Sequence, residues 1–252
     1  MGFAGGVDEG RATMTGAARA RAVRAVTPPA GGRRLPRLPW IGLACLLGLA
    51  VTAPGAAQAV DLAVMVVDAA GHPVADAVVT ATPDGPALPP LAPTSPLVMD
   101  QIDETYVPYV MVVPKGGTVT FRNSDLTRHH IYSYSDAAKF EFVLSPEQIG
   151  QRKFDQTGVV ALGCNIHDHM IAHLFVTAAP FATVTGKDGK AKLAGLPATG
   201  VMVAAWQPRM KPGATPPQQA VAASALGAPI TLTLPALLPD TRQGLDPERG
   251  NY

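Results

Sequence analysis

Apolar residues along this chain gather in short runs that are separated by Gly, Pro, Asp and Asn. Runs of this length, rich in Val, Ile, Phe and Tyr and broken by turn-forming residues, predict β-strands. The strands predicted in this way cover residues 61–68, 74–81, 106–113, 118–121, 140–144, 152–155, 159–162, 171–176 and 201–206. No helical periodicity of useful length occurs outside the N-terminal region. The pattern therefore predicts an all-β protein built from sandwiched sheets.

The N-terminal region differs in composition from the rest of the chain. A basic segment, 33–37, precedes an apolar run, 40–51, that is too short to span a bilayer comfortably. Residues 57–59, Ala-Gln-Ala, form a small-x-small cleavage site. We therefore expect residues 1–59 to be a signal peptide with an N-terminal extension, cut before Val60, and the mature protein to be periplasmic. Paired arginines in the basic segment leave twin-arginine export open as an alternative route.

Charge and cysteine content narrow the classes of function. Residues 60–252 carry 13 Lys and Arg against 17 Asp and Glu, a formal net charge of −4, which argues against a nucleic-acid partner. These residues contain no second apolar span, so we expect no membrane span in the mature chain. We also expect the mature protein to be a monomer. Cys45 lies in the apolar run and is removed with it, which leaves Cys164 as the one cysteine. An unpaired cysteine in an exported protein is a reactive thiol, a disulfide partner for another chain or a metal ligand.

The surroundings of Cys164 favour the metal ligand. Cys164, His167 and Met170 form a Cys-x2-His-x2-Met loop between the predicted strands 159–162 and 171–176. A thiol, an imidazole and a thioether are ligand types of the copper sites that use two His, one Cys and a weak axial Met. Two strands that clamp a short loop aim its side chains at one point. The loop cannot supply the second imidazole, which must come from upstream.

Two neighbouring histidines are available upstream. His129 and His130 point to opposite faces of a strand, so one of them at most can reach the metal. The loop described above, together with the phrase Phe121-x-Asn123 followed by His129, resembles the cupredoxins, and most closely their plastocyanin-like and amicyanin-like members. Exported proteins of this kind are often labelled methylamine-utilisation-like. The resemblance covers residues 97–178.

The resemblance implies a Greek-key β-sandwich that holds one type-1 copper ion per chain. The metal ligands that it implies are His129, Cys164, His167 and Met170. Each has an alternative reading from the residues alone: Cys164 as a buried structural cysteine, His167 as a solvent-exposed loop residue, and Met170 as core packing. His130 is the alternative upstream ligand, or a partner that supports the cysteine loop by a hydrogen bond.

Two further histidines lie near the site, His169 within the loop and His173 in the strand that follows it. His169 and His173 could join His167 in a second, all-imidazole site for copper or zinc. The loop speaks against such a site, because its residues already point at the first metal. We expect His173 to be a surface residue of the following strand.

The segments on either side of the cupredoxin-like part share a second resemblance. Residues 61–81 resemble the opening of carboxypeptidase-regulatory-like, Ig-type β-sandwich domains, and the expected continuation arrives only at residues 185–197. We expect residues 60–93 and 180–235 to be the two parts of one small Ig-like sandwich into which the cupredoxin domain is inserted or against which it packs. The alternative is two unrelated β extensions. Residues 236–252 are rich in Pro, Gly and polar residues and are expected to form a flexible tail.

The function that these features favour is that of a periplasmic copper protein that carries one electron to or from a redox partner protein. Such a protein converts no substrate and is not an enzyme. A copper chaperone or storage protein uses the same ligands, and a metal-free exported Ig-like binding protein is a third class. Copper oxidases and nitrite reductases use several cupredoxin domains, whereas this chain has ligands for one.

Overall fold

The structure is a computed structural model that describes residues 59–240. The predicted signal peptide, up to residue 58 and including Cys45, lies outside the described residues, as do residues 241–252 of the predicted tail. Residues 59–240 form strands β1 to β16 and a single 3-10 turn, η1, at Ala223–Ala225. No helix in that part of the chain has the length and apolar character needed to cross a membrane.

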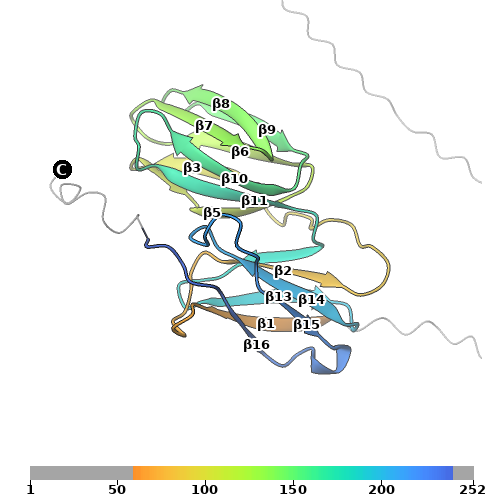
Figure 1. The fold of residues 1–252 in the computed structure, drawn as a ribbon. Coiled ribbons are helices and arrows are strands. Elements are labelled where there is room, and N and C mark those ends of the chain that lie inside the picture. The colour runs from red at the N-terminus through yellow and green to blue at the C-terminus, as the bar shows by residue number, and fades with distance from the viewer. Residues whose placement is uncertain (1–58, 241–252) are drawn as a thin grey trace, which may run out of the picture. The chain divides into compact units, whose positions relative to one another are not determined.

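The middle of the chain forms a sandwich of two sheets (Figure 1). Its strands are β3 (Val98–Ile102), β4 (Thr105–Val107), β5 (Val110–Pro114), β6 (Gly117–Asn123), β7 (His129–Ser135), β8 (Ala138–Leu144), β9 (Ile149–Phe154), β10 (Gly158–Cys164) and β11 (Ile171–Thr177). One sheet has the order β5-β11-β10-β7-β8 and the other β4-β3-β6-β9. Because β6 pairs with β9 and β7 with β10, the chain alternates between sheets in a Greek-key path.

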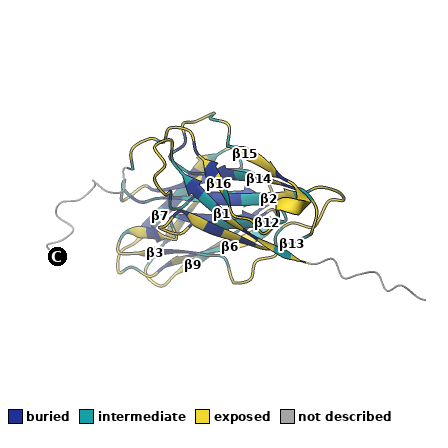
Figure 2. Cartoon of the chain, turned by 90° about the horizontal axis from the view of Figure 1, so that it is seen from below, coloured by how far each residue is buried: buried dark blue, intermediate teal, exposed yellow. Residues whose placement is uncertain are grey.

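The core of this sandwich is built by alternate residues of both sheets. In β7, His129 and Ile131 are buried whereas His130 and Tyr132 are partly exposed, as the two-residue period of a strand requires. The same alternation runs along β6, where buried and more exposed positions follow one another, and Figure 2 shows buried and exposed stretches interleaved along the strands of the molecule. The buried cluster joins both sheets through the large side chains Met99, Phe121, Phe154, Ile131 and Leu174.

The segments on either side of this sandwich in the sequence form a second, smaller one (Figure 1). One sheet consists of β13 (Lys190–Leu196), β1 (Val60–Val67) and β16 (Ile230–Thr233), and the other of β12 (Phe181–Val184), β2 (Val78–Pro83), β14 (Val201–Trp206) and β15 (Gln218–Val221). A separate buried cluster, with Leu62, Val79, Leu193 and Val203, fills the space between them. The predicted fold class, all-β with a Greek-key sandwich and a smaller second sandwich, is confirmed.

Some predicted strands begin or end elsewhere. The predicted strand 74–81 starts only at Val78, because Thr185 holds the preceding segment in a turn: its Oγ1 accepts from the Ala77 amide at 2.9 Å and donates to the Val74 carbonyl at 2.7 Å. The predicted strand 106–113 is two strands, β4 and β5, in different sheets. Pro108 separates them, and a proline has no N–H to continue a ladder.

The chain stays hydrogen bonded beyond residue 236, where the flexible tail was expected to begin. Leu237 forms an antiparallel bridge with Met210, and the Leu238 amide donates to the Arg209 carbonyl at 2.8 Å. The side chains of Met210 and Leu237 both belong to, or pack on, the buried cluster of the smaller sandwich. Residues 236–238 of the predicted tail are therefore held against the smaller sandwich by the burial of these apolar side chains.

Candidate metal centre

Two adjacent strands bring the predicted ligands together. His129 is the first residue of β7 and Cys164 the last residue of β10, and Cys164 lies opposite Ile131 in the ladder between them. The loop that follows is fixed at both ends: the Asn165 amide donates to the His130 carbonyl at 2.9 Å and the Met170 amide to the His167 carbonyl at 3.0 Å. These bonds turn the chain so that the loop folds back over the end of β7.

Three donor atoms converge at this end of the sandwich. The Nδ1 atoms of His129 and His167 lie 3.2 Å apart, and the Cys164 Sγ lies 3.7 Å from the first and 3.9 Å from the second. His129 and Cys164 are buried and His167 is partly exposed. The upstream imidazole that faces the sulfur is therefore that of His129.

Carboxylates occupy the other nitrogen of each imidazole. The His129 Nε2 lies 2.7 Å from the Asp125 Oδ2, and the His167 Nε2 lies 3.3 Å from the Glu104 Oε1. A neutral imidazole has a single N–H, and a carboxylate accepts it. Each carboxylate therefore favours the tautomer that leaves a lone pair on Nδ1, directed at the point that the two rings share with the sulfur.

The spacing of the three atoms fits a single metal ion. Typical bonds from zinc are about 2.0 Å to an imidazole nitrogen and about 2.3 Å to a thiolate sulfur. Two donor atoms can share an ion only if the distance between them is shorter than the sum of their two bond lengths to that ion. This limit is about 4.0 Å for two nitrogens and about 4.3 Å for a nitrogen and a sulfur. All three distances between His129, Cys164 and His167 meet this condition.

Met170, the predicted axial ligand, is buried at the end of the same loop. Its side chain is 1% exposed and belongs to the core cluster that contains Cys164 and Leu162. Met170 is thus more deeply buried than His167, whose side chain is 17% exposed. The role of Met170 as a ligand stays a prediction.

His130 and His173 lie apart from the three donors, whereas the ring of His169 lies 6.0 Å from that of His167. The His130 Nε2 is 3.3 Å from the Glu141 Oε2, on the other face of β7. His173 is partly buried, not a surface residue as expected, because its ring packs 5.4 Å from that of Tyr109 and 6.1 Å from that of Trp206. Among residues 59–240, the one group of three metal-binding side chains with closely spaced ligand atoms is His129, Cys164 and His167.

Sequence reasoning assigned no supporting role to the residues that hold these donors, although Asn123 was part of the motif on which the resemblance rests. Asn123 is one of them: its Nδ2 donates to the carbonyls of Thr127 and Leu144 at 2.8 and 2.9 Å, and its Oδ1 accepts from the Asp125 amide at 2.9 Å. A buried asparagine thus shapes the loop 124–128 and sets the interval to His129. Asn123 lies two residues beyond Phe121, where the inward alternation of the predicted strand 118–121 would continue, and a polar residue at that position was the signal for this role.

Tyr106 supports the cysteine strand from the opposite sheet. Its hydroxyl donates to the Gly163 carbonyl at 3.0 Å, next to Cys164. Burial, with smaller contributions from Cys164 and Tyr132, raises the pKa of the Tyr106 phenol far above its usual range. The hydroxyl therefore stays protonated and keeps donating.

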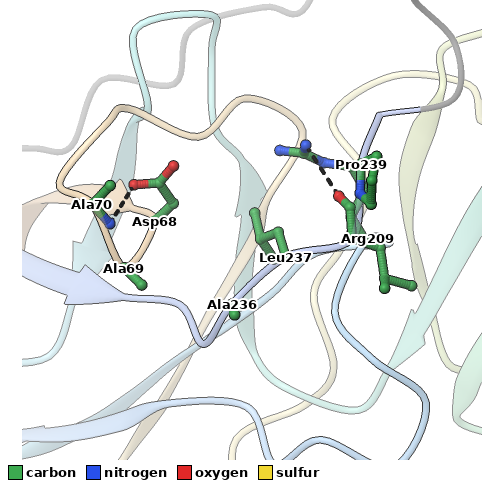
Figure 3. Close-up of a pocket in the computed structure, with 8 residues that line it drawn as sticks. Asp68, Ala69, Ala70, Arg209, Ala236, Leu237 and Pro239 are labelled. Carbon is green, nitrogen blue, oxygen red and sulfur yellow. Dashed lines mark hydrogen bonds between the residues drawn. The ribbon is translucent and has the colours of Figure 1, made fainter.

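A pocket elsewhere in the described chain has a different character. Figure 3 shows it at the smaller sandwich, between Asp68 and the segment after β16. The Asp68 carboxylate accepts from the Ala70 amide at 2.9 Å, and the Arg209 guanidinium donates to the Leu238 carbonyl at 3.4 Å. Both charged groups at this pocket are engaged by the neighbouring backbone, and none of the predicted metal ligands lines it.

Comparison with known proteins gives structural matches alone. No protein-family model and no curated protein matches the chain. A purple cupredoxin from Nitrosopumilus maritimus is 22% identical, with a TM-score of 0.30 over 32% of this chain and 99% of its own. A methionine-to-alanine variant of amicyanin in its Cu(I) form is 19% identical, with a TM-score of 0.31 over 39% of this chain and 99% of its own.

A Cu-containing nitrite reductase from Thermus scotoductus SA-01 is also similar, at 23% identity and a TM-score of 0.30. The match covers 38% of this chain and 25% of the reductase chain. Similarity at these levels is not evidence for a shared function. What residues 59–240 themselves present is a Greek-key sandwich with one His–Cys–His donor group at its end.

Proposed function

We propose that this protein binds one type-1 copper ion and carries single electrons. The observation that supports this proposal is the convergence of two imidazole Nδ1 atoms and one thiol sulfur, with spacings of 3.2 to 3.9 Å. Two His, one Cys and a weak Met are the donor set of electron-transfer copper sites. With Met170 as the fourth, axial residue, the set favours copper over zinc.

The chain's own residues provide what electron transfer needs. A bound copper ion supplies exchange between Cu(I) and Cu(II). His129 and Cys164 are anchored at the ends of paired strands and are 0% and 3% exposed, so their positions change little when the charge of the site changes. The surrounding apolar cluster excludes water from the sulfur. No step in this function converts a substrate.

The solvent side of the site gives the route for electrons. The His167 side chain is 17% exposed, whereas that of His129 is fully buried. Exposed apolar side chains lie in both loops that carry the site, Ile166 at 47% and Leu126 at 95% exposed. We propose that a redox partner protein docks at this end, in the periplasm.

Copper loading of purified residues 60–252 tests the proposal. Cu(II) is expected to give an intense thiolate-to-copper absorption band at one copper per chain, with a matching EPR signal. Cys164→Ser is expected to abolish the band in a folded protein, and Glu141→Ala, at a carboxylate outside the site, is expected to keep it. A colourless complex in the unmodified protein would exclude the type-1 assignment, and rapid loss of Cu(I) to a chelator would favour a copper chaperone.

A further inference from the structure

Glu104 occupies an unusual backbone position beside the site. It is the second residue of the two-residue turn between β3 and β4, which Ile102 and Thr105 close as a pair. Asp103 and Glu104 have φ angles of 50° and 52°, in the left-handed region. Two-residue hairpin turns in which both residues have positive φ favour glycine at the second position, because a residue with a side chain is strained in that backbone conformation. A glutamate at a position that favours glycine indicates that its side chain has a functional role.

The turn is bonded to the support of the buried ligand. Asp125 accepts from the Asp103 amide at 2.5 Å and from the Glu104 amide at 3.0 Å. The same carboxylate lies 2.7 Å from the His129 Nε2. Asp125 therefore fixes the place of the turn relative to the donor atoms, and with it the starting point of the Glu104 side chain.

The Glu104 carboxylate faces two histidines of the cysteine loop. Its Oε1 lies 3.3 Å from the His167 Nε2, and its Oε2 lies 3.7 Å from the His169 Nε2. His167 is the one donor of the group that is partly exposed. No strand holds it, in contrast to His129 and Cys164, so its ring orientation depends on such side-chain contacts.

We infer that Glu104 is the positioning residue for His167, an inference that rests on the proposed copper function. The carboxylate accepts the Nε2–H of His167 and thereby keeps the Nδ1 lone pair turned to the metal. Its second oxygen, directed at His169, keeps the carboxylate in place over the ring. Its negative charge next to a ligand also favours the oxidised site, which carries one more positive charge than the reduced site.

Two substitutions separate the effect of orientation from that of charge. Glu104→Gln keeps an oxygen that accepts the Nε2–H and removes the charge. Glu104→Gly removes both and suits the left-handed φ, so this variant is expected to fold at least as well as the unmodified protein. Glu141→Ala is the matched control, because Glu141 lies at the same 3.3 Å from His130, which is not a donor.

The first measurement uses metal-free protein at pH 8 and records the imidazole tautomers by nitrogen-15 NMR. Glu104→Gly is expected to lower the share of the Nε2–H tautomer at His167 and to leave that of His129 unchanged. Glu104→Gln is expected to keep both. If His167 in Glu104→Gly retains the tautomer seen with Glu141→Ala, Glu104 is an ordinary surface charge and the inference is overturned.

The second measurement uses copper-loaded protein and records copper affinity and reduction potential. Glu104→Gly is expected to weaken copper binding about 10- to 100-fold, the usual cost of losing a partner of a ligand, and to raise the potential. Glu104→Gln is expected to keep the affinity and still raise the potential. Equal affinity and potential in Glu104→Gly and Glu141→Ala would contradict the inference. An unmodified protein that binds no copper would instead overturn the proposed function, while the metal-free tautomers still decide the role of Glu104.

Discussion

The Nδ1 atoms of His129 and His167 lie 3.2 Å apart, although the two residues are 38 positions apart in the sequence. Two imidazole nitrogens that both present lone pairs repel one another at this distance, unless a proton or a metal ion lies between them. The carboxylates of Asp125 and Glu104 draw the ring protons to the opposite nitrogens. The polar groups around the two rings therefore favour a cation at the shared point.

The first prediction concerns which upstream histidine binds the metal. His129→Ala is expected to abolish the thiolate-to-copper band, or to open a position that added imidazole refills, because it removes a donor 3.7 Å from the Cys164 sulfur. His130→Ala is expected to keep the band, because His130 faces Glu141. Absorption spectra of the two copper-loaded variants check this. Loss of the band in His130→Ala alone would assign the donor to His130.

The second prediction concerns the axial residue. Met170→Leu removes the thioether, the proposed weak axial donor, from a buried position and nearly keeps the side-chain volume. The protein is expected to keep its copper and its band while the reduction potential rises, because Cu(II) uses the axial donor more than Cu(I) does. Redox titration of the unmodified and Met170→Leu proteins measures the shift. An unchanged potential and spectrum would identify Met170 as core packing.

Much of the site's chain path could be predicted from local patterns. The apolar runs 159–162 and 171–176 lie within β10 and β11, and the spacing within the loop determines that Cys164 and His167 turn to the same side. Strand alternation separates His129 from its neighbour. Each of these inferences depends on a few consecutive residues, which is why sequence alone carries them.

The supporting carboxylates could not be predicted in the same way. Glu104 reaches His167 from a different strand pair, and the Asp-Glu turn that carries it lacks the glycine by which such turns are recognised. The pairing of β1 with β16, in which Val64 lies opposite Ile230, likewise joins distant ends of the described chain. Contacts of this kind follow from the packing of whole sheets, which no local pattern encodes.

The third prediction concerns the stability of the four-stranded sheet at low pH. Asp100 of β3 is buried opposite Arg122 of β6 and accepts from its guanidinium Nε at 2.9 Å and from the Ser124 hydroxyl at 3.1 Å. Burial alone would raise the pKa of Asp100, but these hydrogen bonds outweigh it and lower the pKa. A lowered pKa in the folded state means that the ionised form stabilises the fold at neutral pH and that this contribution is lost as the pH falls through the folded-state pKa.

Asp100→Asn is therefore expected to lower the free energy of unfolding at pH 7 by about 1 kcal/mol, since half-exposed Arg122 weakens the pair by solvent screening. The difference from the unmodified protein is expected to shrink as the pH drops below about 4. Denaturant unfolding at several pH values measures it. Asp136→Asn, at a fully exposed carboxylate, serves as the control. A difference that stays constant down to low pH would show that the charge of Asp100 does not matter.

The last prediction concerns two glycines of the smaller sandwich that share one backbone conformation. Gly189 and Gly195 have φ angles of 73° and 74°. A Cβ at Gly195 would meet no atom within 4 Å, whereas one at Gly189 would lie 2.7 Å from the Val66 carbonyl oxygen. That oxygen belongs to β1 and accepts from the Val74 amide at 2.9 Å, and the Val66 amide donates to the Gly189 carbonyl at 2.8 Å, so neither backbone can move aside without straining these hydrogen bonds.

Gly195→Ala is accordingly expected to lower the free energy of unfolding by about 1–2 kcal/mol, the cost of placing an alanine in the left-handed backbone region. Gly189→Ala carries the same cost and a backbone clash in addition, so its loss is expected to be larger. Denaturant unfolding followed by fluorescence measures both. The copper band is expected to stay unchanged in the folded variants, because the donors lie on strands and loops of the other sandwich. An equal decrease in the free energy of unfolding for the two substitutions would show that the β1 backbone shifts at Val66 and that the contact at Gly189 does not constrain the sheet.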